Sequence, residues 1–411
     1  MSPLYPLYID PGTGSMLFSL VMGLAAVCYF FVRTVLIKAK VLFSGKNAAV
    51  SEMRRSFVIY NEGNQYWNVF KPVLDAFERR GTAVSYLTSA ENDPFFNEPY
   101  THITGEYIGM GNKAFARLNL LDADVVLMTT PGLEVYQLKR SKSVKHYAHI
   151  LHETGDATCY RLFGIDWFDS ILLSGEYQKN DIRRLEEIRG LRQKELVVVG
   201  STYLDVYKEK VKNVPCEKNH VFTVLVSPSW GKGSLLNVFG ERLLDPLVKT
   251  SWRIIVRPHP QSKKSERDML VKLEERYRGA ANLVWDYSAE NLETLAVSDV
   301  MFSDFSGIIF DYIFLFDKPV IYTDAFFNIE MYDASDLDHL PWRFEVVKTF
   351  GKGLQDPDLE KLPDIIREAV TDEHAALARR AAKEIAWQFV GDAGERAVDF
   401  LITKQKEVGN A

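Results

Sequence analysis

The sequence predicts an α/β protein with two doubly wound, Rossmann-like halves that face a cleft, preceded by one transmembrane helix. Three observations predict this arrangement. The chain has 411 residues, which is longer than one hydrophobic core usually serves. Past the first 40 residues, short runs rich in β-branched residues alternate with helical patterns, which is typical of a parallel sheet covered by helices. Near the N-terminus lies one long apolar segment without charges.

The apolar segment predicts a membrane anchor within residues 1–40. No charged residue occurs from Pro11 to Val32, and the apolar span is roughly 20 residues long, about the thickness of the bilayer hydrocarbon. A cleaved signal peptide would need basic residues before the span, and the first ten residues have none. A buried core helix, or a helix that enters the bilayer and turns back, stays open as an alternative.

Charges on either side of the span predict its orientation. Only Asp10 precedes the span, whereas these basic residues follow it: Arg33, Lys38, Lys40, Lys46, Arg54 and Arg55. Because Lys and Arg are enriched on the cytoplasmic side of membrane spans, we expect a single-pass protein of the inner cell membrane with a cytoplasmic catalytic part.

Residues 41–210 predict the first Rossmann-like half. Its expected strands are 56–60, 83–87, 124–130, 144–151, 170–175 and 195–200. Helical patterns lie between them, and two of these, 68–81 and 176–190, end at a glycine, as helices often do.

Residues 211–375 predict the second half, after a looser stretch near 206–219. Its expected strands are 221–227, 252–258, 282–286, 299–303 and 319–323, and its expected helices are 235–249, 265–277, 289–297 and 307–316. Helical segments near 357–370 and 373–408 follow, and residues 376–411 are expected to form a C-terminal helical segment. Ligands of open α/β sheets bind beyond the carboxyl ends of the strands, so we expect a site in the cleft between the halves.

Composition narrows the function classes. Lys and Arg total 49 and Asp and Glu total 55, a formal charge of −6, which argues against nucleic acid as a main partner. Cys28, Cys159 and Cys216 are far apart and lack metal-ligand spacing, so neither a disulfide framework nor a zinc site is expected. A reducing compartment is the simpler interpretation. Acidic residues are scattered along the chain, so we expect neither a metal nor a cofactor.

Two stretches of the second half predict phosphate binding. The first, "WRIIVRPHPQ", ends a buried strand in Arg257 and His259, which places a permanent cation and an imidazole at the carboxyl end of the sheet. Arg can hold a phosphate through two parallel hydrogen bonds, and His can donate to a phosphate oxygen. The alternative is an ordinary solvated strand end.

The second stretch, "SDVMFSDFSGIIFDY", predicts a strand, a turn and a helix. Ser303, Asp304, Ser306 and Gly307 lie in the turn, where backbone N–H groups at the helix start form an anion site. The alternative is that Ser303 or Asp304 only caps the helix.

The pairing of "RPHP" with "SDFSGIIFDYIFLFDKPVIY" some forty residues later resembles the CDP-glycerol glycerophosphotransferase family, the teichoic acid primases and polymerases of bacteria, which have the two-domain GT-B fold. Looser similarity extends over about residues 144–325, through "SGEYQKNDI", "VVGSTYLD" and "VLVSPSWGKGS". The resemblance implies that residues 41–210 bind the acceptor and that residues 211–375 bind a CDP-linked donor.

The resemblance also implies roles for single residues. Arg257 and His259 would face the donor diphosphate, and Ser303, Ser306 and Gly307 would bind phosphate from the helix start. Asp304 in the same turn is a further candidate substrate-binding residue. Asp311, one turn into the helix, is a candidate ribose contact, with a helix-face carboxylate as the alternative. Trp230, Lys232 and Ser234 are candidates for lining the nucleotide pocket, although "WGKG" lacks the spacing of a P-loop.

The base is expected in "HETGDATCYRLFG". Family members carry a W-H-G-T element at the end of a strand of the first half, with its histidine as the base, and the matching residue here is His152. Histidine suits this role because its pKa lies near working pH. The glycine comes late, at Gly155, and the basic residue that usually follows is absent. Either Glu153 shares in the acceptor chemistry, or the acceptor differs from a glycerol phosphate chain, and the candidate catalytic residues are His152, Glu153 and His259.

Two neighbours of His152 are expected to have structural roles. Strand alternation places His149 on the face opposite His146 and His152, which favours packing inside the sheet, although His149 stays open as an alternative base. Asp156 is expected to cap the loop.

The leading hypothesis is a membrane-anchored transferase in cell-envelope polymer synthesis. It would move a polyol phosphate, glycerol phosphate first, from a CDP-linked donor to a hydroxyl of a lipid-linked or glycan acceptor and release CMP. The first alternative is a GT-B glycosyltransferase that uses a nucleotide sugar. The second is a non-catalytic, membrane-tethered nucleotide-binding protein, because a fold alone does not determine function. The sequence leaves the acceptor, the polyol and the oligomeric state open.

Overall fold

The computed structural model describes residues 22, 28, 29 and 32 and the ranges 54–215, 220–323 and 328–409. The chain separates into two compact units, Met1–Arg54 and Arg55–Ala411, and both sheets belong to the second unit. The predicted anchor lies outside the described residues, apart from the four isolated positions. Within the described part of the chain, no helix is long and apolar enough to cross a membrane.

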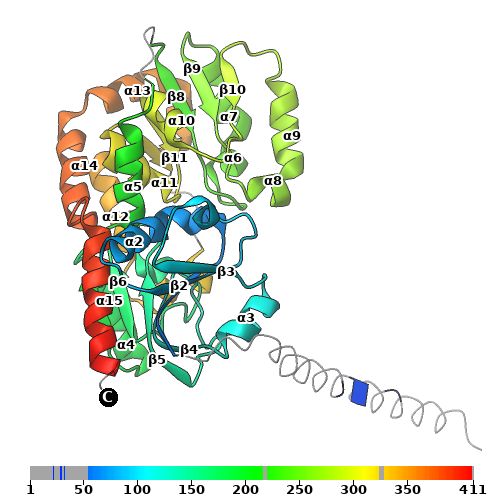
Figure 1. Ribbon diagram of the computed structural model, residues 1–411. Coiled ribbons are helices and arrows are strands. Elements are labelled where there is room, and N and C mark those ends of the chain that lie inside the picture. The colour runs from blue at the N-terminus through cyan, green and yellow to red at the C-terminus, as the bar shows by residue number, and fades with distance from the viewer. Residues whose placement is uncertain are drawn as a thin grey trace, which may run out of the picture. The chain divides into compact units, whose positions relative to one another are not determined.

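The first half of the second unit holds a parallel sheet in the order β3-β2-β1-β4-β5-β6-β7 (Figure 1). Its strands are β1 Arg55–Asn61, β2 Val84–Thr88, β3 Ile103–Tyr107, β4 Asp122–Met128, β5 Ser143–Ile150, β6 Ser170–Leu173 and β7 Glu195–Val198. All the predicted strands of this half are present. The edge strand β3 was not predicted, because "ITGEY" has only one fully buried side chain and no apolar run.

Helices cover both faces of this sheet and join it to the second. They are η2 Asn64–Tyr66, α2 Trp67–Arg79, η3 Pro94–Asn97, α3 Asn112–Leu118, η4 Ala157–Cys159, α4 Gln178–Arg189 and α5 Thr202–Val211. Helix α2 forms because its apolar residues recur at a spacing of three and four, which creates one apolar face. Phe70, Val73, Leu74 and Phe77 on that face are fully buried against the sheet.

The second half holds another parallel sheet, in the order β10-β9-β8-β11-β12-β13. Its strands are β8 Thr223–Val226, β9 Arg253–Val256, β10 Leu283–Trp285, β11 Val300–Ser303, β12 Val320–Thr323 and β13 Gly351–Leu354. The five predicted strands are present. The edge strand β13 was missed because "GKGL" has two glycines and a single buried residue.

The helices of the second half differ from the prediction in one place. They are α6 Leu235–Val238, α7 Gly240–Val248, α8 Ser262–Ser265, α9 Arg267–Arg276, α10 Leu292–Val297, α11 Ile308–Phe316, η5 Ile329–Met331, η6 Asp333–Asp336, α12 Trp342–Phe350, η7 Asp356–Lys361 and α13 Leu362–Thr371. The prediction of one helix over 235–249 was wrong, because the chain breaks at Gly240, whose φ of +40° lies outside the right-handed helical region.

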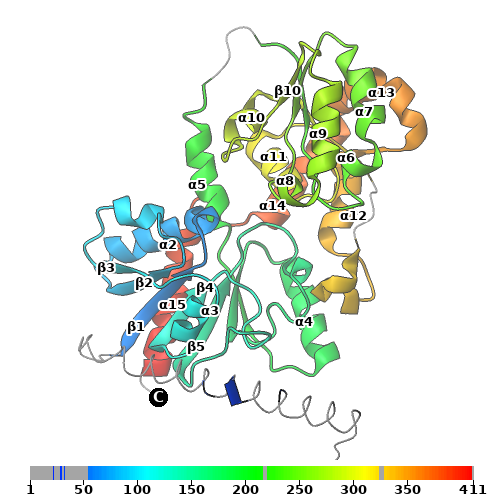
Figure 2. The same cartoon turned by 90° about the vertical axis from the view of Figure 1, so that its right-hand side faces the viewer.

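The predicted helix over 373–408 is also two helices, α14 Glu373–Ala386 and α15 Ala393–Gly409. Asp205 of α5 explains the break, because its carboxylate accepts hydrogen bonds from Trp387 Nε1 and from the backbone N–H groups of Gly391 and Ala393. After the break α15 returns to the first half and packs beside α2 (Figures 1 and 2). The domain limits expected from the sequence stay a prediction.

A second crossing connects the halves. The segment 328–341, between β12 and α12, extends from the second half to the first (Figure 2). Asp333 there accepts hydrogen bonds from the backbone N–H groups of Phe163 and Gly164 and pairs with Arg189 of α4. This crossing brings the start of α12 next to the loop that follows β5.

Candidate active site

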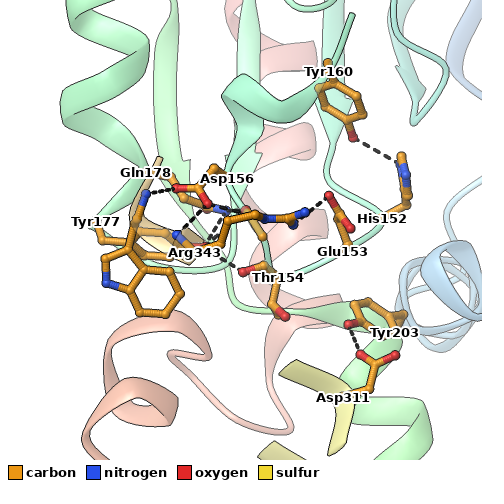
Figure 3. Close-up of polar contacts among 12 residues, drawn as sticks. His152, Glu153, Thr154, Asp156, Tyr160, Tyr177, Gln178, Tyr203, Asp311 and Arg343 are labelled. Carbon is orange, nitrogen blue, oxygen red and sulfur yellow. Dashed lines mark hydrogen bonds and ion pairs between the residues drawn. The ribbon is translucent and has the colours of Figure 1, made fainter. Parts of the chain in front are cut away.

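The loop after β5 lies at the carboxyl edge of the first sheet. Strand β5 ends at Ile150, and the loop that follows it lies beside Arg343 of α12 (Figure 3). On the strand, His149 is fully buried and His146 is nearly so, with His146 Nε2 2.9 Å from the hydroxyl of Ser170. His152 is the first histidine past the strand and is half-buried. The sheet therefore delivers His152 to the site and keeps the other two histidines inside.

His152 is held by hydroxyl groups on one side of its ring. Its Nδ1 lies 3.0 Å from the hydroxyl of Tyr160 and 3.2 Å from that of Thr129, and the ring of Tyr66 packs 5.0 Å away, centre to centre. Burial lowers the pKa of His152, an effect that the neighbouring Glu153 opposes. The imidazole is therefore neutral near physiological pH and can accept a proton.

Tyr160 also orients the His152 ring. Its hydroxyl lies 3.2 Å from His149 Nε2, and burial lowers the pKa of His149 to about 3, so that this ring stays neutral. If Tyr160 donates its one proton to His149 Nε2, its oxygen can accept the Nδ1 proton of His152. The Nε2 lone pair of His152 is then available, as a general base requires.

Glu153 and Arg343 form an ion pair across the two halves. Arg343 lies in the first turn of α12, and its Nη2 donates to Glu153 Oε1 at 3.0 Å (Figure 3). Burial opposes the ionisation of Glu153, but the Arg343 guanidinium holds the Glu153 pKa below its ordinary value. The carboxylate is therefore ionised at the site.

Asp156 fixes the start of α12. Its two carboxylate oxygens accept hydrogen bonds from the backbone N–H groups of Trp342, at 2.9 Å, and of Arg343, at 3.0 Å. These N–H groups have no partner within their own helix, so Asp156 acts as the cap of a helix from the other half. The sequence suggested a cap at Asp156, but one for its own loop.

Gly155 is required by the approach of Arg343. A Cβ placed on Gly155 would lie 1.6 Å from Arg343 Nη2, which no side chain allows. The backbone around Gly155 is also held, because Gln178 Nε2 donates to its carbonyl at 2.6 Å and the Tyr177 hydroxyl donates to the Thr154 carbonyl at 2.6 Å. The late glycine of this element therefore makes room for a guanidinium.

The start of α11 faces the same loop. A Cβ placed on Gly307 would lie 2.9 Å from Glu153 Oε2, so the carboxylate reaches the N-terminal end of α11. A hollow of about 20 Å³ is lined by Asp304, Ser306 and Arg343, together with apolar residues of the same turn, of α11 and of α12. The predicted anion turn and the loop of His152 are thus brought together.

Two side chains of the turn are used to hold its shape. The Ser303 hydroxyl is fully buried and donates to the Ser227 carbonyl at 2.6 Å. The Asp304 carboxylate accepts from the backbone N–H groups of Ser229, Leu235 and Ser306. Asp304 therefore caps α6, a different helix from the one suggested by the sequence, and fixes the turn. Direct contacts of these side chains with a donor stay a prediction.

Arg257 and His259 lie at the end of β9, as predicted. The Arg257 guanidinium pairs with Asp286 and donates to the Ser288 hydroxyl at 3.0 Å and to its carbonyl at 2.8 Å, so it joins the ends of β9 and β10. His259 Nδ1 accepts from the backbone N–H of Gln261 at 3.1 Å. A neutral imidazole that accepts at Nδ1 carries its proton on Nε2, where it can donate to a phosphate oxygen.

The other predicted donor residues are spread around this edge. Trp230 is 43% exposed, with its ring centre 6.4 Å from that of His259, and Lys232 is exposed. The Ser234 hydroxyl is buried and accepts from Asn237 Nδ2 at 3.0 Å. Asp311 accepts a short hydrogen bond from the Tyr203 hydroxyl of α5.

The pKa of Asp311 is unusual for a carboxyl group. Burial raises its pKa to about 7, against the opposing hydrogen bond from Tyr203 and with a smaller contribution from the charge of Glu153. A carboxyl group that changes charge near neutral pH is typical of functional sites. Whether it contacts ribose stays a prediction.

Sequence reasoning missed Arg343, Tyr160 and Tyr203. Arg343 lies in "PWRFEVV", 190 residues after its partner Glu153, and no local pattern connects the two. Tyr160 lies in the loop "HETGDATCYRLFG", eight residues after His152. This short separation was the signal that the sequence offered. Within the residues that the structure describes, no group of His, Cys, Asp and Glu side chains could hold a metal ion.

Comparison with solved structures shows the fold. The wall teichoic acid polymerase TagF, soaked with CDPG, matches with a TM-score of 0.52 at 13% identity, over 92% of this chain and 98% of that chain. A putative UDP-N-acetylglucosamine 2-epimerase from Listeria monocytogenes matches with a TM-score of 0.56 at 12% identity, over 86% of this chain and 98% of that chain. The fold is thus α/β and GT-B-like, with two parallel sheets.

Comparison of sequences identifies the family. A search of curated proteins finds no match. The family model of CDP-Glycerol:Poly(glycerophosphate) glycerophosphotransferases matches residues 180–388, more than half of the chain and nearly all of the second half described above. The chain therefore belongs to the CDP-glycerol glycerophosphotransferase family.

Proposed function

We propose that this glycerophosphotransferase moves glycerol phosphate from CDP-glycerol to a hydroxyl of a lipid-linked or glycan acceptor, in the synthesis of a teichoic-acid-like envelope polymer. Family membership supports the donor and the reaction class. The proposal depends mainly on one observation: two adjacent residues of one loop have complementary roles. His152 supplies a neutral imidazole there, and the next residue, Glu153, reaches the N-terminal end of α11.

The reaction proceeds as one displacement at phosphorus. The acceptor hydroxyl oxygen forms a bond to the phosphorus that bears glycerol, and the bond from that phosphorus to the oxygen bridging to CMP breaks. CMP leaves with that oxygen, and His152 Nε2 takes the hydroxyl proton. His259 Nε2–H and the backbone N–H groups at the start of α11 stabilise the charge on the phosphate oxygens, mainly through position and electrostatics.

Attachment to the inner membrane is part of the proposal and depends on the sequence of residues 1–40 alone. An uncharged apolar span followed by basic residues would hold the catalytic part at the membrane surface. An acceptor carried by a lipid would then be within reach.

The test is a comparison of donors. Membranes that contain the full chain are incubated with CDP-glycerol, CDP-ribitol or UDP-sugars, and released nucleotides are measured. The proposal expects CMP from CDP-glycerol and at least a 100-fold loss in His152→Ala, in the range of general-base contributions. Release of UDP from a UDP-sugar without release of CMP would instead identify a glycosyltransferase, and no release with any donor would favour a binding protein.

A further inference from the structure

Arg343 is a buried cation whose environment is built for an anion. Its side chain is only 9% exposed, and the guanidinium lies 5.9 Å from the ring centre of Phe310. Asp156 caps its helix and Gly155 leaves room for its Nη2. The position of the guanidinium is therefore determined by packing on several sides, as a ligand-binding group requires.

The guanidinium is not fully used by the protein. Nη2 donates to Glu153, whereas the buried Nε forms an ion pair with Asp156 Oδ2 at 3.5 Å but makes no hydrogen bond within the described residues. A buried, unsatisfied charged donor costs free energy unless a partner takes it. Arg343 therefore has capacity to bind a further oxygen.

The first turn of α11 also lines the hollow beside Arg343. Arg343 and Ser306 both line it, and its volume of about 20 Å³ is close to what one water molecule needs. Helix α11 has nine residues, and its N-cap residue is Gly307. Backbone N–H groups and the helix dipole favour negative charge at this end of the helix. Two carboxylates reach this region of the described chain. Glu153 pairs with Arg343 and lies beside Gly307, whereas Asp304 lines the hollow and accepts the backbone N–H of Ser306.

The hollow alone is too small for a phosphate group. A phosphate that binds here must therefore displace the Glu153 carboxylate and occupy its volume. Glu153 can move, since its side chain is 37% exposed, whereas Arg343 is held on several sides. We propose that Arg343 binds the transferred phosphate of the donor, and that the Glu153 carboxylate competes with this phosphate for the guanidinium. The inference rests on the proposed function, because it takes the donor to be CDP-glycerol.

The two members of the pair then have opposite effects on donor binding, which a purely structural ion pair would not give. Arg343→Gln removes a charged hydrogen-bond donor and should raise the Kd of CDP-glycerol about 10- to 100-fold. Glu153→Gln removes the competing charge and should lower the same Kd several-fold. Arg343→Lys keeps the charge without the planar fork and should lie between wild type and Arg343→Gln.

The experiment measures Kd by calorimetry on the full chain in detergent, with CDP-glycerol, cytidine and pyrophosphate as ligands. Cytidine has no phosphate, so its Kd should be the same in all variants. Arg379→Gln is the matched control, because Arg379 is another buried arginine of the second half, paired with Asp317, and should leave all three Kd values unchanged. Thermal unfolding establishes that each variant is folded.

Two results would overturn the inference. One is an unchanged Kd for CDP-glycerol in folded Arg343→Gln or Arg343→Lys protein. The other is a weaker affinity in Glu153→Gln, which would mean that the ion pair only holds the halves together. If wild-type protein binds no CDP-glycerol, the proposed function fails, and the inference is then decided with pyrophosphate, whose Kd must still rise in Arg343→Gln.

Discussion

At the scale of single residues, burial decides the protonation of the site. His149 and His152 both have lowered pKa values because they are removed from water, while Glu153 keeps its charge beside Arg343. The opposite shift occurs at Asp311, where burial raises the pKa to about 7. The candidate site thus combines a neutral imidazole with a carboxyl group that titrates near neutral pH.

Asp311 predicts a pH dependence of stability. Its pKa is about 7 in the folded chain and 3.8 ordinarily, so the folded state binds this proton more tightly than the unfolded state. The contribution of Asp311 to the free energy of unfolding is therefore largest below pH 4 and is lost as the pH rises through 7. Asp311→Asn cannot ionise, so at pH 8 it should be more stable than wild type, on the order of 2 kcal/mol.

Urea unfolding at pH 5 and pH 8 measures this difference. Asp364→Asn serves as the control, because Asp364 is exposed and its replacement should change both values little. Equal stability differences between Asp311→Asn and wild type at the two pH values would contradict the assigned titration.

At the scale of elements, loops and helix ends determine the site. Strand β5 and helices α11 and α12 contribute their ends, and Asp156 of the first half caps α12 of the second. The element types could be predicted, since long apolar runs and helical spacing are local features. The break after Ala386 could not, because a distant carboxylate, Asp205, stabilises it.

Gly155→Ala tests the close approach of α12 to the loop. The added methyl group would overlap Arg343 Nη2, so we expect a loss of about 1–3 kcal/mol in stability and weaker donor binding. Gly279→Ala is the control, because Gly279 has an ordinary φ and no atom within 4 Å of its added Cβ. Chemical unfolding of both variants gives the comparison, and an undisturbed Gly155→Ala protein would mean that Arg343 can lie elsewhere.

At the scale of the whole second unit, residues near the end of the chain complete the hydrophobic core of the first half. Helix α15 packs on α2 and β4, and its Ala397, Val398 and Leu401 are buried in the core of the first half. The first half therefore depends on residues that follow the second half in sequence. We expect the two halves to be coupled in folding through this helix.

Leu401→Ala measures that dependence. Leu401 is 1% exposed, and truncation of a buried leucine costs about 2–5 kcal/mol. Leu377→Ala, on α14, is the matched control, because Leu377 is 63% exposed and should cost little. Differential scanning calorimetry should show a lower Tm for Leu401→Ala alone, and equal Tm values would exclude a stabilising role for α15.

Most strands of the two parallel sheets, the turn at Gly307 and the histidine that follows β5 could be predicted from the sequence, because strand and helix periodicity and turn residues are properties of neighbouring positions. Two contacts follow from the three-dimensional arrangement alone: Arg343 pairs with Glu153 across 190 residues, and Asp156 caps a helix of the other half. Such contacts depend on how two sheets are oriented and on which loops lie between them, and no local pattern of residues records that.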